Sequence, residues 1–171
     1  SKPILIDPGI STYNKNKIRL LERSTANHNT VSINGLNSSK IWSAFRVGKR
    51  AEVEFNKDSE SHISVFHDGY SDIGVIHQRD FIFNENKFVI EDKINSNIIA
   101  DAHFHFHPNC KIRLDKKKNK LKVENIEIIF KNVASKIVKT KFYYSESFND
   151  KVFGDKIIVS FKNSLISEIY I

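Results

Sequence analysis

The chain has 171 residues, a length that predicts one domain. Its 40% hydrophobic and 27% charged residues are typical of a globular protein and exclude a disordered tail or a membrane span. Cys110 is the single cysteine, which excludes a disulfide scaffold. Lys and Arg number 27 against 20 Asp and Glu, a net charge of +7. This excess favours an acidic partner, such as an anionic polysaccharide, a nucleic acid or an anionic lipid.

Methionine is absent, including at position 1. We therefore expect the chain to be a processed product or an excised piece of a larger protein.

Short segments rich in Ile, Val and Phe alternate apolar with polar residues, and helical periodicity is nearly missing. Clusters of Asn, Asp, Gly and Lys separate these segments. We expect strands at Ile4–Ile6, Asn29–Ile33, Ala51–Asn56, His62–Phe66, Gly74–Asn84, Lys87–Lys93, Ile98–His107, Lys111–Asp115, Lys120–Glu124, Ile126–Phe130, Lys141–Tyr144, Lys156–Lys162 and Leu165–Ile171. Many short strands at this spacing predict an all-β fold, an antiparallel two-sheet β-sandwich spanning residues 1–171 as a single domain.

Two regions differ from this pattern. Residues 11–43 are rich in Asn, Ser and Thr, which indicates long loops that carry function. The charge run Lys116–Lys118 is expected at a solvated hairpin tip, with a dedicated polyanion site as the alternative.

Asp7 and His28 form a first candidate site. An Asp that ends an apolar strand before Pro8-Gly9 predicts a strand terminator, but the same carboxylate could bind a metal ion or a cation. His28 lies between two Asn residues, where it serves either as a structural histidine or as a ligand. The residue types alone leave these alternatives open.

A second candidate is His67-Asp68. The pair either caps a turn at Asp68-Gly69 or forms an oriented imidazole for acid–base chemistry. The turn is the preferred interpretation.

A third candidate is the strand that carries His103, His105 and His107 on one face and Phe104 and Phe106 on the other. Two neighbouring imidazoles with a distant ligand could bind zinc. The preferred interpretation is a hydrated, half-polar sheet face over a Phe core.

Nucleic acid is not expected as a partner. The sequence holds no recognition helix, no zinc-finger spacing and no aromatic RNA-binding signature.

The order of several motifs resembles the C-terminal portion of heparinase II/III-like proteins. The likeness covers about the first two thirds of the chain, whereas the last third matches only in being rich in strands. It rests on Lys2–Gly9, Tyr13, Arg23–Gly35, Trp42, Phe45–Ala51, His67–Tyr70, His77–Arg79, Ile90–Asp92 and Phe104–Pro108.

The resemblance implies a supersandwich-like C-terminal domain that follows an N-terminal α/α toroid. Characterised members are polysaccharide lyases that cleave uronic-acid polymers, such as heparan sulfate and alginate, by β-elimination. It also implies zinc held by Asp7, His28 and a histidine upstream of this sequence. We therefore expect the isolated chain to bind zinc poorly and to be inactive.

By the same resemblance, His28 and Tyr13 are candidate catalytic residues. Candidate substrate-binding residues are Arg23, Asn29, Trp42 and Arg46. The expected partners are an acidic polysaccharide and the toroid of the same protein, in the periplasm or outside a bacterial cell.

A non-catalytic module is the alternative. It would bind carbohydrate or act as a scaffold in capsule or exopolysaccharide metabolism, with Trp42 and Tyr70 as stacking platforms. The lyase interpretation requires Asp7 and His28 to border a solvent-accessible groove.

Overall fold

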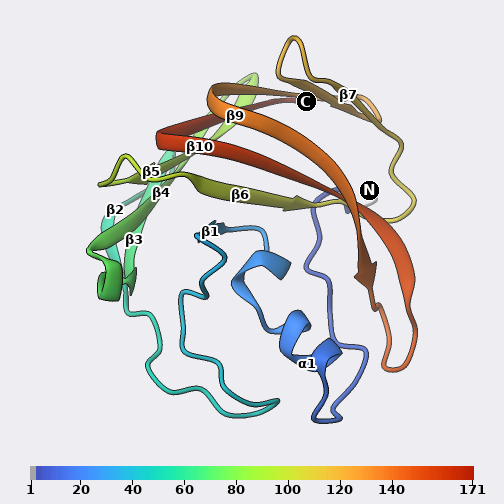
Figure 1. Ribbon diagram of the computed structural model, residues 1–171. Helices are drawn as coiled ribbons and strands as arrows, with labels where there is room; N and C mark the ends of the chain where they lie inside the picture. The colour runs from blue at the N-terminus through green and yellow to red at the C-terminus, as the bar shows by residue number, and fades with distance from the viewer. Residues whose placement is uncertain (1–2) are drawn as a thin grey trace.

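The computed structural model describes residues 3–171, so Lys2, the first residue of the resemblance, lies outside the described residues. Figure 1 shows a curved β-structure whose N-terminal third lies beneath the strands. The helical elements are α1 (Lys17–Glu22), η1 (Thr25–Asn27) and η2 (Ser71–Ile73). The strands are β1 (Val31–Ile33), β2 (Val53–Ser59), β3 (His62–Tyr70), β4 (Val75–Asn84), β5 (Lys87–Ile94), β6 (Ala100–His105), β7 (Ile112–Asp115), β8 (Lys120–Val123), β9 (Ile126–Tyr144) and β10 (Val152–Tyr170).

Within residues 3–171, the strands form one continuous antiparallel network that folds into two layers. The main path of the sheet has the order β2-β3-β4-β5-β10-β9-β8-β7. Off this path, β6 pairs with both β1 and β10. The C-terminal half of β10 pairs with β5 and its N-terminal half with β6, so this strand runs through both layers. The predicted all-β antiparallel fold is confirmed.

The long strands β9 and β10 bend where the two layers meet. Asn132 and Asn163 adopt positive φ angles of 65° and 58°, and the register between the two strands shifts after Phe161. Asn tolerates this left-handed backbone, which allows a bulge in a continuous strand. The prediction of a turn at Asn163-Ser164 that separates two strands is therefore wrong, as is the prediction that Ile126–Phe130 and Lys141–Tyr144 are separate strands.

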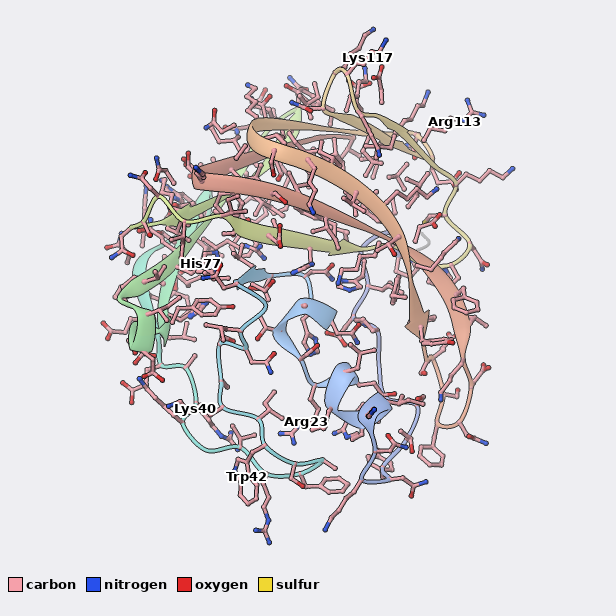
Figure 2. The ribbon with its side chains drawn as sticks, viewed as in Figure 1. Arg23, Lys40, Trp42, His77, Arg113 and Lys117 are labelled. Carbon is pink, nitrogen blue, oxygen red and sulfur yellow. The ribbon has the colours of Figure 1, made fainter. Side chains whose placement is uncertain are left out.

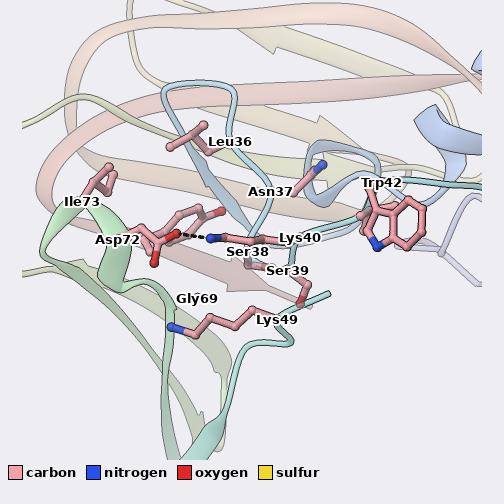
Figure 3. Close-up of a pocket in the computed structure, with 12 residues that line it drawn as sticks. Leu36, Asn37, Ser38, Ser39, Lys40, Trp42, Lys49, Gly69, Asp72 and Ile73 are labelled. Carbon is pink, nitrogen blue, oxygen red and sulfur yellow. Dashed lines mark ion pairs between the residues drawn. The ribbon is translucent and has the colours of Figure 1, made fainter. Parts of the chain in front are cut away.

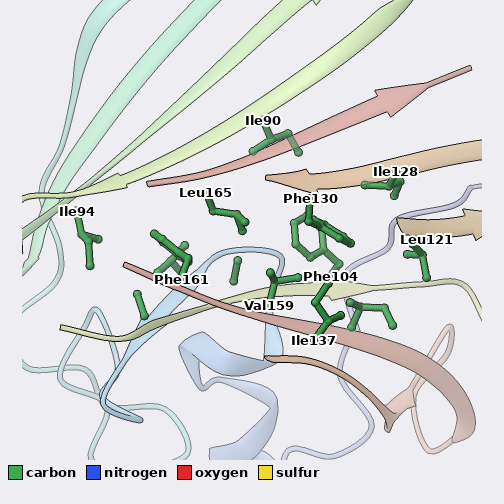
Figure 4. Packing of buried hydrophobic residues seen from close by; sticks show 14 of the residues in the cluster. Ile90, Ile94, Phe104, Leu121, Ile128, Phe130, Ile137, Val159, Phe161 and Leu165 are labelled. Atoms are coloured by element: carbon green, nitrogen blue, oxygen red, sulfur yellow. The ribbon is translucent and has the colours of Figure 1, made fainter. Parts of the chain in front are cut away.

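Aromatic and branched side chains fill the space between the layers (Figure 4). Phe104 from β6, Phe130 from β9 and Phe161 from β10 are at most 2% exposed. Phe104 and Phe130 pack with their ring centroids 5.5 Å apart. Burial of this apolar surface is the main favourable contribution to folding.

The region from residue 11 to 43 is only partly the loop that the sequence predicts. It holds α1, which begins after Asn16, whose side chain accepts a hydrogen bond from the Arg19 amide at 2.9 Å. It also holds β1, where Val31 and Ile33 are fully buried. Among the described residues, no helix is long and apolar enough to cross a membrane.

The N-terminal segment lies along β6 and then reaches the end of β9. The predicted strand at Ile4–Ile6 forms a single bridge between Leu5 and Phe106. The Ile6 amide donates to the His105 carbonyl at 3.0 Å. Further on, Gly9 has a φ of 77° and bridges to Ser145. These contacts fix the backbone on both sides of Asp7.

We expect Gly9→Ala to lower the free energy of unfolding by about 2 to 4 kcal/mol, because it adds a steric overlap to backbone strain. A Cβ at Gly9 would overlap the Ser145 carbonyl oxygen. Gly35→Ala is the matched control, since Gly35 has a φ of 69° but a Cβ added there would meet no atom within 4 Å. Urea denaturation of both variants checks this. An equal loss in the two variants would show that the contact with Ser145 is unimportant.

Candidate functional site

Asp7 and His28 lie side by side although 21 positions separate them in sequence. His28 Nδ1 donates to Asp7 Oδ2 at 2.6 Å. The Asp7 side chain is 64% exposed and the His28 side chain is 40% exposed, so the pair faces solvent. Because the carboxylate engages Nδ1, Nε2 is the nitrogen that His28 can offer to a ligand.

A cleft of about 530 Å³ opens at this pair. Three arginines, Arg19, Arg23 and Arg50, line it together with Glu22. Its remaining lining residues are Asp7, Gly9, Ile10, His28, Ser39, Ile41, Val47 and Ala51. The structure therefore brings the predicted residues Asp7, His28 and Arg23 together in one groove.

Helix α1 positions one wall of this cleft. Arg19 is 9% exposed and lies 3.5 Å from Glu22. Glu22 also accepts a 2.8 Å hydrogen bond from the Ser11 amide and a second one from the Ser11 hydroxyl. Arg23 follows the helix and donates to the Ser43 carbonyl at 2.6 Å. Within the described residues, no carboxylate pairs with Arg23 or Arg50, so the positive charges of both guanidinium groups are available to an anionic ligand.

Sequence reasoning missed Arg19, Glu22 and Arg50 as cleft residues. Arg19 and Glu22 lie on the six-residue helix α1, which is too short to give a periodic signal. Arg50 lies within a segment that carries the family resemblance, which is the signal that could have found it.

Asn29 does not line the cleft but lies behind it. Its side-chain amide donates to the Ile6 carbonyl at 2.8 Å, and its Oδ1 accepts from the His105 amide at 2.7 Å. Its predicted contact with substrate remains a prediction.

His103 and His105 form a buried basic cluster with Lys156, at 4%, 0% and 8% exposed. His103 bonds to the Ser32 hydroxyl at 2.7 Å, and Lys156 donates to the Ala26 carbonyl. The predicted hydrated face is wrong for His103 and His105, because η1 and β1 cover these side chains, whereas His107 is partly exposed. Burial, and then the charge of Lys156, lower the pKa of His103 to about 3 and that of His105 to about 2. Burial also lowers the pKa of Lys156 to about 8.

His67 does not form the alternative acid–base pair with Asp68. Its Nε2 lies 3.0 Å from His77 Nδ1, and Asp68 accepts from the Glu52 amide at 2.8 Å. Asp68-Gly69 lies inside β3, at a register shift between β3 and β4, so the predicted turn between strands is a bulge. Burial and the nearby His77 lower the pKa of His67 to about 4.

His77 continues into a buried ion pair. Its Nε2 lies 2.7 Å from Asp92, which is fully buried. Arg79 binds both oxygens of Asp92, with Nε at 2.7 Å and Nη2 at 3.1 Å. Burial raises the pKa of Asp92, but the Arg79 charge and the His77 hydrogen bond outweigh it and hold this pKa at about 2.

Tyr13 lies in an exposed aromatic cluster and does not line the cleft. Its ring stacks on Phe148 and Phe45 with centroid distances of 5.3 and 6.3 Å. The Arg19 guanidinium lies 5.9 Å from the Tyr13 ring centroid. Through Arg19 the cluster adjoins the cleft, and the catalytic role of Tyr13 remains a prediction.

Trp42 and Arg46 lie together beside the cleft. Trp42 is 61% exposed, with the Arg46 guanidinium 5.0 Å from its ring centroid. Trp42 lines a second pocket of about 310 Å³, where Lys40 pairs with Asp72 at 2.7 Å (Figure 3). The prediction that Tyr70 stacks on sugar is wrong, because Tyr70 is 2% exposed and donates to the Val31 carbonyl.

The charge run Lys116–Lys118 lies at the tip of the β7–β8 hairpin, as predicted. Figure 2 shows Lys117 and Arg113 at the opposite end of the molecule from Arg23 and Trp42. The hairpin tip is therefore separate from the cleft.

The residues that the structure describes do not by themselves fit a zinc site. Asp7 and His28 supply two donors and bond to each other. Between residues 3 and 171, no group of three His, Cys, Asp or Glu side chains could hold a metal ion. A zinc site keeps at least three protein ligands.

Comparison with solved structures places this fold among heparinases. A heparinase III structure matches with a TM-score of 0.76 and 15% identity, over 98% of this chain and 28% of that chain. A mutant of a heparan sulfate lyase from Pedobacter heparinus matches with a TM-score of 0.76 and 17% identity, over 98% and 28%. Another heparinase III structure matches with a TM-score of 0.76 and 19% identity, over 98% and 27%. At these identities the likeness establishes the fold.

No curated protein matches the sequence. The chain spans about 28% of the length of the heparinase III and of the heparan sulfate lyase mutant that it matches. The family model for the heparinase II/III-like C-terminal region matches residues 1–171. The chain therefore belongs to the heparinase II/III-like family and corresponds to its C-terminal region.

Proposed function

We propose that this chain forms one wall of a site that binds a uronic-acid polysaccharide in a β-eliminating lyase. The observation that carries the proposal is one cleft that holds the Asp7–His28 pair together with the guanidinium groups of Arg23 and Arg50, which pair with no carboxylate among residues 3–171. The rest of the protein, an α/α toroid by family resemblance, would supply the opposite wall.

The chemistry of β-elimination matches these groups. A base removes the proton on the carbon next to the uronate carboxylate, and an acid protonates the departing glycosidic oxygen as its bond to carbon breaks. Removal of that proton becomes easier when cations or hydrogen-bond donors neutralise the carboxylate. Arg23 and Arg50 can bind a carboxylate or sulfate through charge-assisted hydrogen bonds.

His28 is suited to proton transfer in this cleft. Asp7 accepts from Nδ1, which fixes the tautomer and orients the ring. Nε2 can then accept or return a proton at the substrate, as in other carboxylate–imidazole pairs. Within this chain His28 is our candidate catalytic residue, and Asp7 orients it.

We expect Arg50→Ala to weaken binding of an acidic oligosaccharide about tenfold, and Arg23→Ala with Arg50→Ala to weaken it about 100-fold. Each change removes a charged donor from the cleft. Calorimetric titration with heparan sulfate and alginate oligosaccharides measures this. Arg113→Ala is the control, because Arg113 is exposed at the opposite end of the molecule. Equal weakening by Arg113→Ala would show that binding depends on net charge alone.

The exposed Trp42 ring favours a non-catalytic carbohydrate-binding module as a second candidate function. Cleavage of a polysaccharide distinguishes the lyase from this module. The protein that contains this chain is assayed on a panel of acidic glycans for the ultraviolet absorbance of unsaturated uronate. A lyase gives absorbance that His28→Ala abolishes while binding persists. Binding without absorbance on any glycan supports the module. Periplasmic or extracellular location is part of the proposal and is tested by cell fractionation.

A further inference from the structure

One side chain spans the two segments that carry the Asp7–His28 pair. Asn29 is the neighbour of His28 in sequence, and its side-chain amide donates at 2.8 Å to the carbonyl of Ile6, the neighbour of Asp7. Its Oδ1 accepts at 2.7 Å from the backbone amide of His105 in β6. The side chain therefore fixes both loops to the sheet and to each other.

The backbone of Asn29 is fixed from the other side. Arg79 Nη1 donates to the Asn29 carbonyl at 2.6 Å. Arg79 is held by Asp92 through two further hydrogen bonds, and His77 binds the same carboxylate. Asp92 is fully buried, so this support belongs to the rigid interior of the sheet.

The chemistry of the position calls for an amide side chain. One end must donate to a carbonyl and the other must accept from a backbone N–H, and Asn does both at this length. In Asp the acceptor remains but the donor is replaced by a second oxygen. That oxygen would lie against the Ile6 carbonyl, and the repulsion would displace the segment that carries Asp7.

We infer that Asn29 is a positioning residue that sets the Asp7–His28 geometry, with Arg79 and Asp92 supporting it from β4 and β5. Asn29 then acts from behind the cleft, through the Asp7–His28 pair, in place of direct contact with a sugar. Only the catalytic role of the Asp7–His28 pair rests on the proposed function. The arrangement itself can be tested without any substrate.

The test is the tautomer of His28 at fixed alkaline pH, measured from imidazole ¹⁵N shifts in the 171-residue chain. The unchanged chain should show Nδ1 protonated, because Asp7 accepts from it. Asn29→Asp should shift His28 toward the Nε2-protonated form that a free imidazole prefers. Asn95→Asp is the matched control. Asn95 Oδ1 also accepts a hydrogen bond from a backbone amide, that of Ile76 at 2.7 Å, but this site is exposed.

A purely structural role for Asn29 predicts a different result. Asn29→Asp would then lower the melting temperature and leave the His28 tautomer unchanged, which would overturn the inference. A second measurement uses the unsubstituted chain and needs no variant to fold. The Asn29 side-chain amide protons should exchange slowly with solvent and show a nuclear Overhauser contact to the Asp7 amide. Fast exchange without that contact would also overturn the inference, while leaving polysaccharide binding at the cleft untouched.

Discussion

Between about pH 5.5 and pH 4, we expect His103 and His105 together to lower the free energy of unfolding by about 3 kcal/mol per pH unit, in addition to the contribution of His67, whose pKa is about 4. His103 and His105 have pKa values of about 3 and about 2 in the folded chain, against an ordinary value of 6.5. In this pH range His103 and His105 bind two protons in the unfolded chain that they do not bind in the folded chain. The contribution of these two histidines to stability is therefore fully present above pH 6.5 and is lost as the pH falls below it.

The groups around the two histidines keep them neutral in the folded state. Lys156 lies beside both, and the charge of His28 also lowers the pKa of His105. His103 Nδ1 and His105 Nε2 are buried without a hydrogen-bond partner among the described residues. A proton added at either nitrogen would be an unpaired buried charge, which is strongly unfavourable.

Urea denaturation at a series of pH values checks this. His103→Gln and His105→Gln should each reduce the slope by about 1.4 kcal/mol per pH unit. His107→Gln is the control, because that ring lies partly exposed against Tyr144. A slope that neither buried substitution changes would contradict the assignment of acid sensitivity to this cluster.

Asp92→Ala should lower the free energy of unfolding by about 3 to 5 kcal/mol. The change leaves the Arg79 guanidinium, whose side chain is 12% exposed, without its carboxylate. It also removes the partner of His77. Breaking a buried pair by removing one member costs more than the pair contributes, because the remaining charge stays desolvated.

Denaturation of Asp92→Ala alongside Asp58→Ala measures this effect. Asp58 lies exposed on the edge strand β2, where a change of less than about 0.5 kcal/mol is expected. A loss below about 1 kcal/mol in Asp92→Ala would show that water replaces the carboxylate and that the support behind Asn29 is not rigid.

Much of the sheet was predictable because each strand has a local signal. Alternation between apolar and polar residues located β4 and β5 to within one residue at each end. The continuity of β10 was not predictable, because an Asn at positive φ serves equally in a turn and in a bulge. Long-range pairing with β5 and β6 decides between them.

The candidate site was predictable in part. The residue types make Asp7 and His28 candidates, the family resemblance strengthens the prediction, and the fold brings the two side chains to 2.6 Å. The burial of His103 and His105 could not be predicted, because their alternation with Phe is also the pattern of a half-exposed strand. Their cover comes from η1 and β1, which lie far earlier in the chain. No local pattern carries that information.

The most direct test of the central claim is a nuclear magnetic resonance titration of the ¹⁵N-labelled chain with an acidic oligosaccharide. If the cleft receives the sugar acid, the signals of His28, Arg23 and Arg50 move first and saturate together, while those of Lys116–Lys118 stay in place. Saturable shifts confined to the β7–β8 hairpin, with His28 unmoved, would contradict the account.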